Sequence, residues 1–368
     1  MPNSFLSVKE FARTALPRLM EHLVFPNLIY RDYSDDFAGN LGDTIRVRKP
    51  VVLQANEFDP AQGVTNQDIN ESAVEVTLDK IATVDVGIEA LQGATNVDDL
   101  NRIFIEPAAE ALAKKINADG LNLYKDIPSF VGTAGQTPST LNAFAQARKK
   151  LNLQQAPVSG RVALWDAEAD CAFTGLDAIV HAEKSGSVQA LREGSVGRVM
   201  GLDNFMSQAV KQHEAGTLSA TSGSLKVKNA AENAQTVTLY ATACAGTIKK
   251  GDLLLIEDKQ YTATEDAEAA DNEIAVKLSP AVTASRDAAV TLIGNHTANL
   301  AFHPMAFAFV TRPLTAPAGV ESYVTNYNGI SLRVVKGYDM VHKKEMLSMD
   351  VLYGFKTMYP ELATRVLG

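Results

Sequence analysis

Residues 74–88, with the sequence VEVTLDKIATVDVGI, alternate between apolar and polar side chains over about fifteen positions. Side chains two residues apart share one face of a β-strand, so the pattern predicts a strand far longer than the usual length of about five to six residues. One face carries an apolar set that only Lys80 interrupts: Val74, Val76, Leu78, Ala82, Val84, Val86 and Ile88. The other face is mostly polar and carries Glu75, Thr77, Asp79, Thr83 and Asp85.

A partner strand is predicted directly before this stretch, at residues 45–53. Its apolar face carries Ile45, Val47, Val51 and Leu53. Residues 56–72 between the two strands are polar and rich in turn-forming residues, so we expect a long hairpin. A two-stranded hairpin alone is marginally stable in water, and its apolar stripe must be covered. Either the chain itself or another chain can provide this cover, and a long projecting hairpin with an extended N-terminal arm before it favours another chain.

The two predicted strands carry opposite charges. The first has Arg46, Arg48 and Lys49, and the second has Glu75, Asp79 and Asp85. Exposed ion pairs contribute about 0–1 kcal/mol each, so these charges would set register and choice of partner more than affinity. These six residues, together with Val84 on the apolar stripe, are the candidate residues of a subunit interface.

Two helices are expected on either side of the hairpin. Ser7 and Glu10 form a capping box for a helix that we expect to be interrupted at Pro17. Asp98 and Asp99 open a second, longer helix, where acidic side chains suit the helix dipole. Its apolar residues recur every four positions, and Pro107 should kink it or mark a restart; they are Leu100, Phe104, Ala108, Leu112 and Ile116.

The rest of the chain mixes helices and strands. Residues 140–210 read as short helices and buried strands, with a strand, a glycine turn and a second strand at 193–210. Six short strands with turn signals between them then follow within about 80 residues, which indicates a small β-barrel or sandwich. Because the mixed pattern resumes afterwards, we interpret residues 217–296 as an inserted domain. The fold class is therefore α+β.

Within residues 299–314, NLAFHPMAFAFVTRPL, we predict a strand that is buried on both faces and bounded by Pro304 and Pro313. The prediction depends on large residues alternating with small ones: Met305, Phe307 and Phe309 with Ala306, Ala308 and Val310. Two more strands are predicted at residues 330–336 and 345–357.

Composition narrows the class of function. The 368 residues include 46% hydrophobic and 21% charged residues, as in ordinary globular proteins, and the formal net charge is -9. This balance argues against tight binding to nucleic acid, which needs clustered Lys and Arg. Two distant cysteines imply no disulfide framework and fit a reducing compartment. No signal peptide and no membrane span are predicted, so we expect a soluble protein kept in cytoplasm-like conditions.

Signals for catalysis or metal binding are weak. Glycines 246 and 251 have the spacing of a phosphate loop, but Asp252 stands where a lysine is required and would repel phosphate. No two of the six histidines have the i, i+4 spacing of a helical zinc site, and no G-x-S-x-G motif is present. His303 could act as a base, but a capping or packing role is the simpler interpretation. We therefore predict no catalytic residue, no metal and no cofactor, and an enzyme with a β-sandwich binding domain is the least favoured alternative.

The order of these parts resembles the major capsid proteins of tailed double-stranded DNA bacteriophages, which have the Hong Kong 97-type fold. Two segments carry the resemblance best. The first runs from Gly197 through Gly201 to Asp203, and the second contains Phe302, His303 and Ala306. Residues 217–296, with the phrase GTIKKGDLLLIEDKQYTA, are similar to the inserted domain of coat proteins from short-tailed Salmonella-type phages.

The resemblance implies a division of the chain into the parts of that fold. These are an N-terminal arm (1–43), an E-loop (44–92), a P-domain (93–128 and 320–368), an A-domain (129–216 and 297–319) and the inserted β-domain (217–296). It also implies pentamers and hexamers that close an icosahedral shell around DNA, with a scaffolding protein and a portal protein as partners. Such a shell is assembled in the bacterial cytoplasm. An encapsulin-like cellular compartment shell is the alternative with the same fold.

Overall fold

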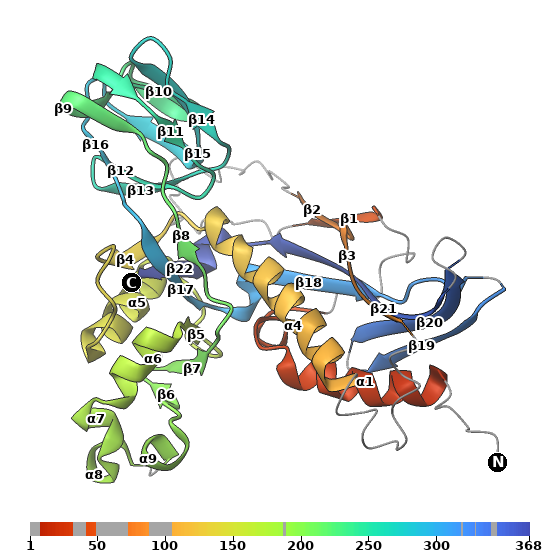
Figure 1. Ribbon diagram of the computed structural model, residues 1–368. Helices are drawn as coiled ribbons and strands as arrows, with labels where there is room; N and C mark the ends of the chain where they lie inside the picture. The colour runs from red at the N-terminus through yellow and green to blue at the C-terminus, as the bar shows by residue number, and fades with distance from the viewer. Residues whose placement is uncertain are drawn as a thin grey trace, which may run out of the picture. The chain divides into compact units, whose positions relative to one another are not determined.

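The computed structural model describes residues 8–31, 42–48, 73–87, 105–186, 189–317, 319–327, 329–339 and 344–368 (Figure 1). The chain divides into two compact units. Unit 1 comprises Met1–Arg18, Arg31–Ala109 and Ala308–Met358, and unit 2 comprises Leu19–Tyr30, Glu110–Phe307 and Tyr359–Gly368.

A five-stranded antiparallel sheet forms the centre of unit 1. Its order is β18-β21-β20-β19, and β3 pairs with β21 as well. The strands are β3 (Lys80–Gly87), β18 (Phe307–Arg312), β19 (Glu321–Tyr327), β20 (Ile330–Asp339) and β21 (Lys344–Thr357). The strand predicted at residues 345–357 is present as β21, where Leu347, Met349, Val351 and Tyr353 are buried.

The predicted hairpin is present, but its second strand is divided. β1 (Thr44–Arg48) pairs with β2 (Ala73–Thr77) in a separate two-stranded sheet. The chain then leaves this pair at Leu78 and Asp79 and continues as β3, whose partner is β21. The strand predicted as one piece therefore belongs to two sheets.

Part of the apolar stripe is covered by the chain itself. Val76 and Leu78 are 0% exposed and Ala82 is 4% exposed in the single chain. At these three residues the chain itself provides the cover, whereas the prediction favoured another chain. Ile88 and residues 49–72 lie outside the described residues.

β2 passes close to β21 at a glycine. A Cβ atom added to Gly354 would lie 2.0 Å from the backbone oxygen of Thr77. The absence of a side chain at this position allows the backbones of β2 and β21 to approach each other.

The helices differ from the prediction at their prolines. α1 (Val8–His22) runs without interruption through Pro17. Its long buried face, which includes Phe11, Leu16 and Leu19, offsets the one backbone hydrogen bond that proline removes. α4 (Glu106–Leu121) begins next to Pro107, and residues 98–104, where we predict the first part of this helix, lie outside the described residues.

A seven-stranded sheet organises much of unit 2. Its order is β4-β22-β17-β5-β7-β6, and β8 pairs with β17. The strands are β4 (Phe130–Gly132), β5 (Val162–Trp165), β6 (Arg198–Val199), β7 (Leu202–Met206), β8 (Gln212–His213), β17 (His296–Phe302) and β22 (Ala363–Leu367). The C-terminal strand β22 was not predicted, and it lies in this sheet rather than with the strands at 320–357.

Five helices accompany this sheet: α5 (Leu141–Leu153), α6 (Ala167–Thr174), α7 (Asp177–Val180), α8 (Ala182–Ser185) and α9 (Gln189–Glu193). The ring centroid of Trp165 of β5 lies 5.2 Å from that of Phe144 of α5 and 4.8 Å from that of Phe173 of α6. The two phenylalanine rings are 4.4 Å apart. Asp166 caps α6 by accepting a hydrogen bond from the backbone N–H of Ala169, as its position before the helix predicts.

The strand predicted between Pro304 and Pro313 is present as β18, although it begins only at Phe307. Before it, residues 299–314 contain the end of β17 and a short 3₁₀ helix, η5 (Pro304–Ala306). Pro304 lacks the N–H that a continuous strand would need, so the chain turns there and enters a second sheet. Residues Phe307 to Val310 are buried as predicted, whereas Met305 is 43% exposed on η5.

Residues 219–292 form a six-stranded antiparallel sheet with the order β16-β12-β13-β15-β10-β9. The strands are β9 (Ser219–Val227), β10 (Ala231–Ala245), β12 (Leu253–Ile256), β13 (Lys259–Ala263), β15 (Glu273–Ala284) and β16 (Val290–Leu292), so all six predicted strands are present, and β9, β10 and β15 are longer than predicted. The two outer strands meet, because Lys226 forms a β-bridge with Ala289 and the N–H of Val227 donates to the carbonyl of Ala288 over 3.0 Å. β11 (Thr247–Ile248) pairs with β14 (Ala267–Glu268) beside this sheet.

Candidate functional site

An ion pair connects the two charged strands of unit 1. Nε of Arg46 lies 2.9 Å from Oε1 of Glu75, and the two residues are opposite each other in the ladder. The side chains are 77% and 56% exposed. The backbone ladder sets the register of β1 and β2, and the exposed ion pair leaves both charges accessible to a partner.

The other candidate interface residues have different positions. Asp79 is exposed, and Asp85 accepts a hydrogen bond from the hydroxyl of Thr83. The backbone of Arg48 pairs with Ala73, and Lys49 lies outside the described residues. Val84 is half-buried on β3, opposite Met349 of β21.

The first motif of the resemblance forms the β6–β7 hairpin of unit 2. Gly197 and Gly201 have positive φ angles of 66° and 84°, which glycine adopts without steric cost. Asn204 donates to the carbonyl of Gly197 over 2.8 Å. Arg198 and Asp203 are paired across the hairpin, with 3.6 Å between the guanidinium and the carboxylate. The motif is therefore a structural turn.

The second motif lies where β17 ends. Phe302 is fully buried and packs against Phe25 and Phe307, and Ala306 is buried as well. Nδ1 of His303 accepts a hydrogen bond from the backbone N–H of Met305 over 3.3 Å. Burial lowers the pKa of His303, and the positive charge of Arg161 lowers it further. His303 therefore caps η5, as the simpler interpretation predicted.

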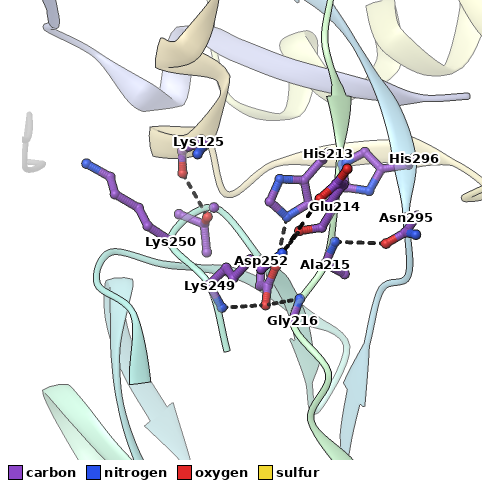
Figure 2. A network of polar contacts seen from close by, with 12 residues as sticks. Lys125, His213, Glu214, Ala215, Gly216, Lys249, Lys250, Asp252, Asn295 and His296 are labelled. Carbon is purple, nitrogen blue, oxygen red and sulfur yellow. Dashed lines mark hydrogen bonds and ion pairs between the residues drawn. The ribbon is translucent and has the colours of Figure 1, made fainter. Parts of the chain in front are cut away.

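A buried polar network connects the six-stranded and seven-stranded sheets of unit 2, and Figure 2 shows part of it. We call this network the joint, and its members are Tyr124, His213, Asp252, His296 and Arg365. His213 of β8 is at its centre. Its Nε2 lies 2.8 Å from Oδ1 of Asp252, and its Nδ1 lies 2.9 Å from the hydroxyl of Tyr124. A carboxylate only accepts hydrogen bonds, so Nε2–H of His213 donates to Asp252, and Nδ1 shares a hydrogen bond with the tyrosine hydroxyl.

Asp252 is satisfied on both oxygens. Its Oδ2 accepts hydrogen bonds from the backbone N–H groups of Gly216, over 3.0 Å, and Lys249, over 2.8 Å. The chain can pass this closely only because residue 216 is a glycine. An added Cβ atom would lie 2.1 Å from the carbonyl oxygen of Thr247. A buried carboxylate with these partners pins the start of β12 to the chain that follows β8.

Arg365 of β22 completes the joint from the C-terminal strand. Its guanidinium donates to the carbonyl oxygens of Gly251, over 2.8 Å, and Lys125, over 3.1 Å. It also donates to the hydroxyl of Thr262 over 3.1 Å and lies over the ring of Tyr124. Complete burial lowers the pKa of Arg365 to about 9, so the side chain remains charged at neutral pH.

His296 of β17 lies beside His213, with ring centroids 5.1 Å apart. Its Nδ1–H donates to the carbonyl of Gly294 over 2.9 Å, and its Nε2 makes no hydrogen bond in the part of the chain that the structure describes. Burial lowers the pKa of His296 to about 4. The ring is therefore neutral at physiological pH.

A pair of amide hydrogen bonds adds a second connection between the same sheets. The N–H of Phe130 donates to Gln260 over 3.1 Å, and Gln260 donates back to the carbonyl of Phe130 over 2.8 Å. Phe130 also packs with Leu253 and Leu367 in a small apolar cluster. The joint therefore combines polar and apolar contacts.

The arrangement of the joint is that of a fixed connection. Most of its polar groups are hydrogen-bonded to one another, whereas Nε2 of His296 and Nε of Arg365 make no hydrogen bond among the described residues. The described residues contain no group of three or more His, Cys, Asp or Glu side chains that could hold a metal ion. Sequence reasoning did not find His213, His296 or Arg365. The available signal was Asp252, a carboxylate placed directly before the apolar run LLLI, which was considered only as a mismatch to a phosphate loop.

Solved structures of other proteins are similar in fold to nearly the whole chain. A chain in the structure of Mycobacterium phage Che8 is 18% identical, with a TM-score of 0.54 and coverage of 94% of this chain and 90% of that chain. A chain in the capsid structure of Cyanophage P-SCSP1u is 11% identical, with a TM-score of 0.50 and coverage of 94% and 88%. The fold is that of a phage capsid protein. A virus-like particle from Pyrococcus furiosus has a TM-score of only 0.39, at 11% identity and with coverage of 97% and 98%.

No model of a protein family and no curated protein sequence matches the chain. Among the described residues, no helix is both long and apolar enough to cross a membrane.

Proposed function

We propose that this chain is the major capsid protein of a tailed double-stranded DNA bacteriophage and has the Hong Kong 97-type fold. The observation that carries the proposal is the similarity of fold to phage capsid chains along almost the entire length of both chains. Its activity is assembly rather than catalysis. Copies of the chain form pentamers and hexamers, which close an icosahedral shell around the genome.

In this proposal β1 and β2 belong to the E-loop, and their charged residues contact a neighbouring subunit. The exposed pair Arg46–Glu75 supports this role, because both charges remain accessible. Unit 1 contributes the P-domain strands, and the seven-stranded sheet of unit 2 contributes the A-domain. The net charge of -9 suits a container that encloses DNA without binding a specific sequence.

Residues 217–296 are the inserted domain in this proposal and correspond to the insertion of short-tailed Salmonella-type phage coat proteins. The joint supports a fixed placement of this domain on the A-domain sheet. A scaffolding protein and a portal protein are the expected assembly partners, and assembly takes place in the host cytoplasm before the shell becomes part of the virion.

Electron microscopy and light scattering of the purified chain, with and without its scaffolding protein and at several salt concentrations, test the proposal. We expect capsomers or closed shells. A chain that stays monomeric under all of these conditions would rule the proposal out. Genes for a portal and a terminase beside this gene would support a phage, whereas a cargo enzyme beside it would support a compartment shell.

A charge exchange tests the E-loop contact separately. Arg46→Glu changes an exposed pair that contributes about 0–1 kcal/mol to the fold, so the monomer should stay folded while assembly weakens. Adding Glu75→Arg restores the internal pair in the opposite orientation. Assembly that is unaffected by both variants would count against a subunit contact at this position.

A further inference from the structure

The β6–β7 hairpin of unit 2 has a strained turn. Val199 pairs with Leu202, so the hairpin closes through Met200 and Gly201, whose φ angles are 49° and 84°. Two-residue turns with positive φ at both positions favour Asn, Asp or Gly at the first, because a larger side chain clashes with the backbone. Backbone strain of this kind is concentrated at positions where a side chain has a function.

Met200 is also exposed next to other large apolar atoms. Its side chain is 39% exposed, and Leu153 at the end of α5 is 70% exposed. Both line a shallow hollow of about 350 Å³ together with Ala145, Arg148, Lys149 and Asn152. Met200 also lines a second hollow of about 410 Å³, with Leu141, Ile179 and Val196 among its other residues. We call Arg148, Lys149, Asn152, Leu153 and Met200 the Met200 surface.

Neighbouring exposed apolar side chains with a polar rim are typical of a protein interface. Methionine suits such a place because its flexible side chain adapts to the surface that it meets. The Met200 surface therefore has an apolar centre, Met200 and Leu153, and a basic rim, Arg148 and Lys149.

The same unit carries a segment of opposite charge. α5 has three basic residues and no acidic one, whereas residues 167–185 have four acidic residues and a single lysine. Asp177 and Glu183 in that segment have side chains that are 85% and 71% exposed. Two complementary faces on one chain can make a contact between unlike surfaces, and such a contact, when repeated, gives a ring if the rotation between neighbouring subunits closes.

We propose that the Met200 surface binds residues 167–185 of a second copy of this chain. Met200 and Leu153 fill the centre of the contact, and Arg148 and Lys149 face Asp177 and Glu183 at its edge. This inference rests on the proposed function, since it names the surfaces through which neighbouring subunits of one capsomer meet.

Met200→Asn is the informative variant, because it should stabilise the unassembled chain and weaken assembly. Asparagine tolerates the left-handed backbone, so the melting temperature of the unassembled chain should rise by about 2 °C. Loss of the apolar side chain should raise the concentration at which half of the chain is assembled about tenfold. Met200→Leu is the matched control, since it keeps both the strain and the apolar side chain and should change neither quantity much.

Two further variants test the rest of the surface. Leu153→Ser removes a side chain that is 70% exposed, so folding is preserved while assembly weakens about tenfold. Arg148→Glu with Lys149→Glu should prevent assembly, and adding Asp177→Lys with Glu183→Lys to the same chain should restore it by exchanging the charges.

For every variant, analytical ultracentrifugation over a range of concentrations measures assembly, and thermal unfolding measures the stability of the unassembled chain. The inference is overturned if Met200→Asn and Leu153→Ser assemble like the wild type, or if assembly falls only together with thermal stability. Normal shells from these variants would leave the proposed function intact and make the surface available to a different protein. A wild-type chain that never assembles would overturn both proposals.

Discussion

Nε2 of His213 donates to Oδ1 of Asp252 over 2.8 Å, and both side chains are at least 95% buried. The two residues are 39 positions apart and come from the two sheets of unit 2 that the joint connects. Because Asp252 also accepts two backbone hydrogen bonds, this pair stabilises the junction through one carboxylate.

Asp252→Asn should destabilise the folded chain by about 3 kcal/mol. The amide would place a donor against Nε2–H of His213 and leave part of a buried network unsatisfied. Urea unfolding followed by circular dichroism measures the loss. Asp271→Asn, at an exposed turn of the six-stranded sheet, is the matched control and should change stability by less than about 0.5 kcal/mol. Equal effects of the two variants would show that the joint has no special role.

His296 should make stability depend on pH. Its pKa is about 4 in the folded chain and is lowered from 6.5 by burial, so the unfolded chain takes up a proton at higher pH than the folded chain does. The stabilisation is complete above about pH 6.5 and is lost as the pH falls towards about 4, by about 3 kcal/mol in all. The free energy of unfolding, measured by urea titration at several pH values, should therefore fall less steeply over this range in His296→Asn. An unchanged slope in the variant would contradict the assignment.

Gly354→Ala should disturb the approach of β2 to β21. The new methyl group would lie 2.0 Å from the carbonyl oxygen of Thr77, and a backbone atom cannot move aside at low cost. We expect a loss of about 2 kcal/mol or more in the free energy of unfolding. Gly337→Ala on the neighbouring strand β20 has no atom within 4 Å of the added Cβ, so it should have a much smaller effect. A similar loss in both variants would argue against the close approach.

Val84→Asp tests the placement of β3 in the chain's own sheet. Val84 is half-buried and faces Met349 in the ladder, so a carboxylate there should lower the stability of the monomer by about 1–3 kcal/mol. Ile81→Asp, at a residue that is 38% exposed, should cost less. Thermal unfolding of the unassembled chain compares the two. An unchanged melting temperature in Val84→Asp, with assembly lost, would instead support cover by a second chain.

Periodicity predicted the strands well where each strand stays in one sheet. The positions of the six strands of residues 219–292 follow from the alternation of apolar side chains, although β9, β10 and β15 are longer than predicted. The strand between Pro304 and Pro313 was predicted in the same way and is present as β18. The rule failed at residues 74–88, where the alternation continues across a break and only tertiary pairing shows that the chain passes from one sheet to another.

The joint was harder to predict because its members are far apart in the sequence. Tyr124, His213, Asp252 and Arg365 meet only after two sheets have formed, and none of them belongs to a local motif. The strand β22 was missed for a related reason. Its central Arg365 suggests a solvent-exposed side chain, yet it is buried because carbonyl oxygens from two other segments surround the guanidinium.

The mass and shape of the purified protein test the central claim most directly. Size-exclusion chromatography with light scattering, followed by electron microscopy of the same fractions, should give closed particles of uniform diameter in which this chain is the main component. A single species near 39.5 kDa at every salt and protein concentration, with no particles on the grid even when the scaffolding protein is present, would contradict it.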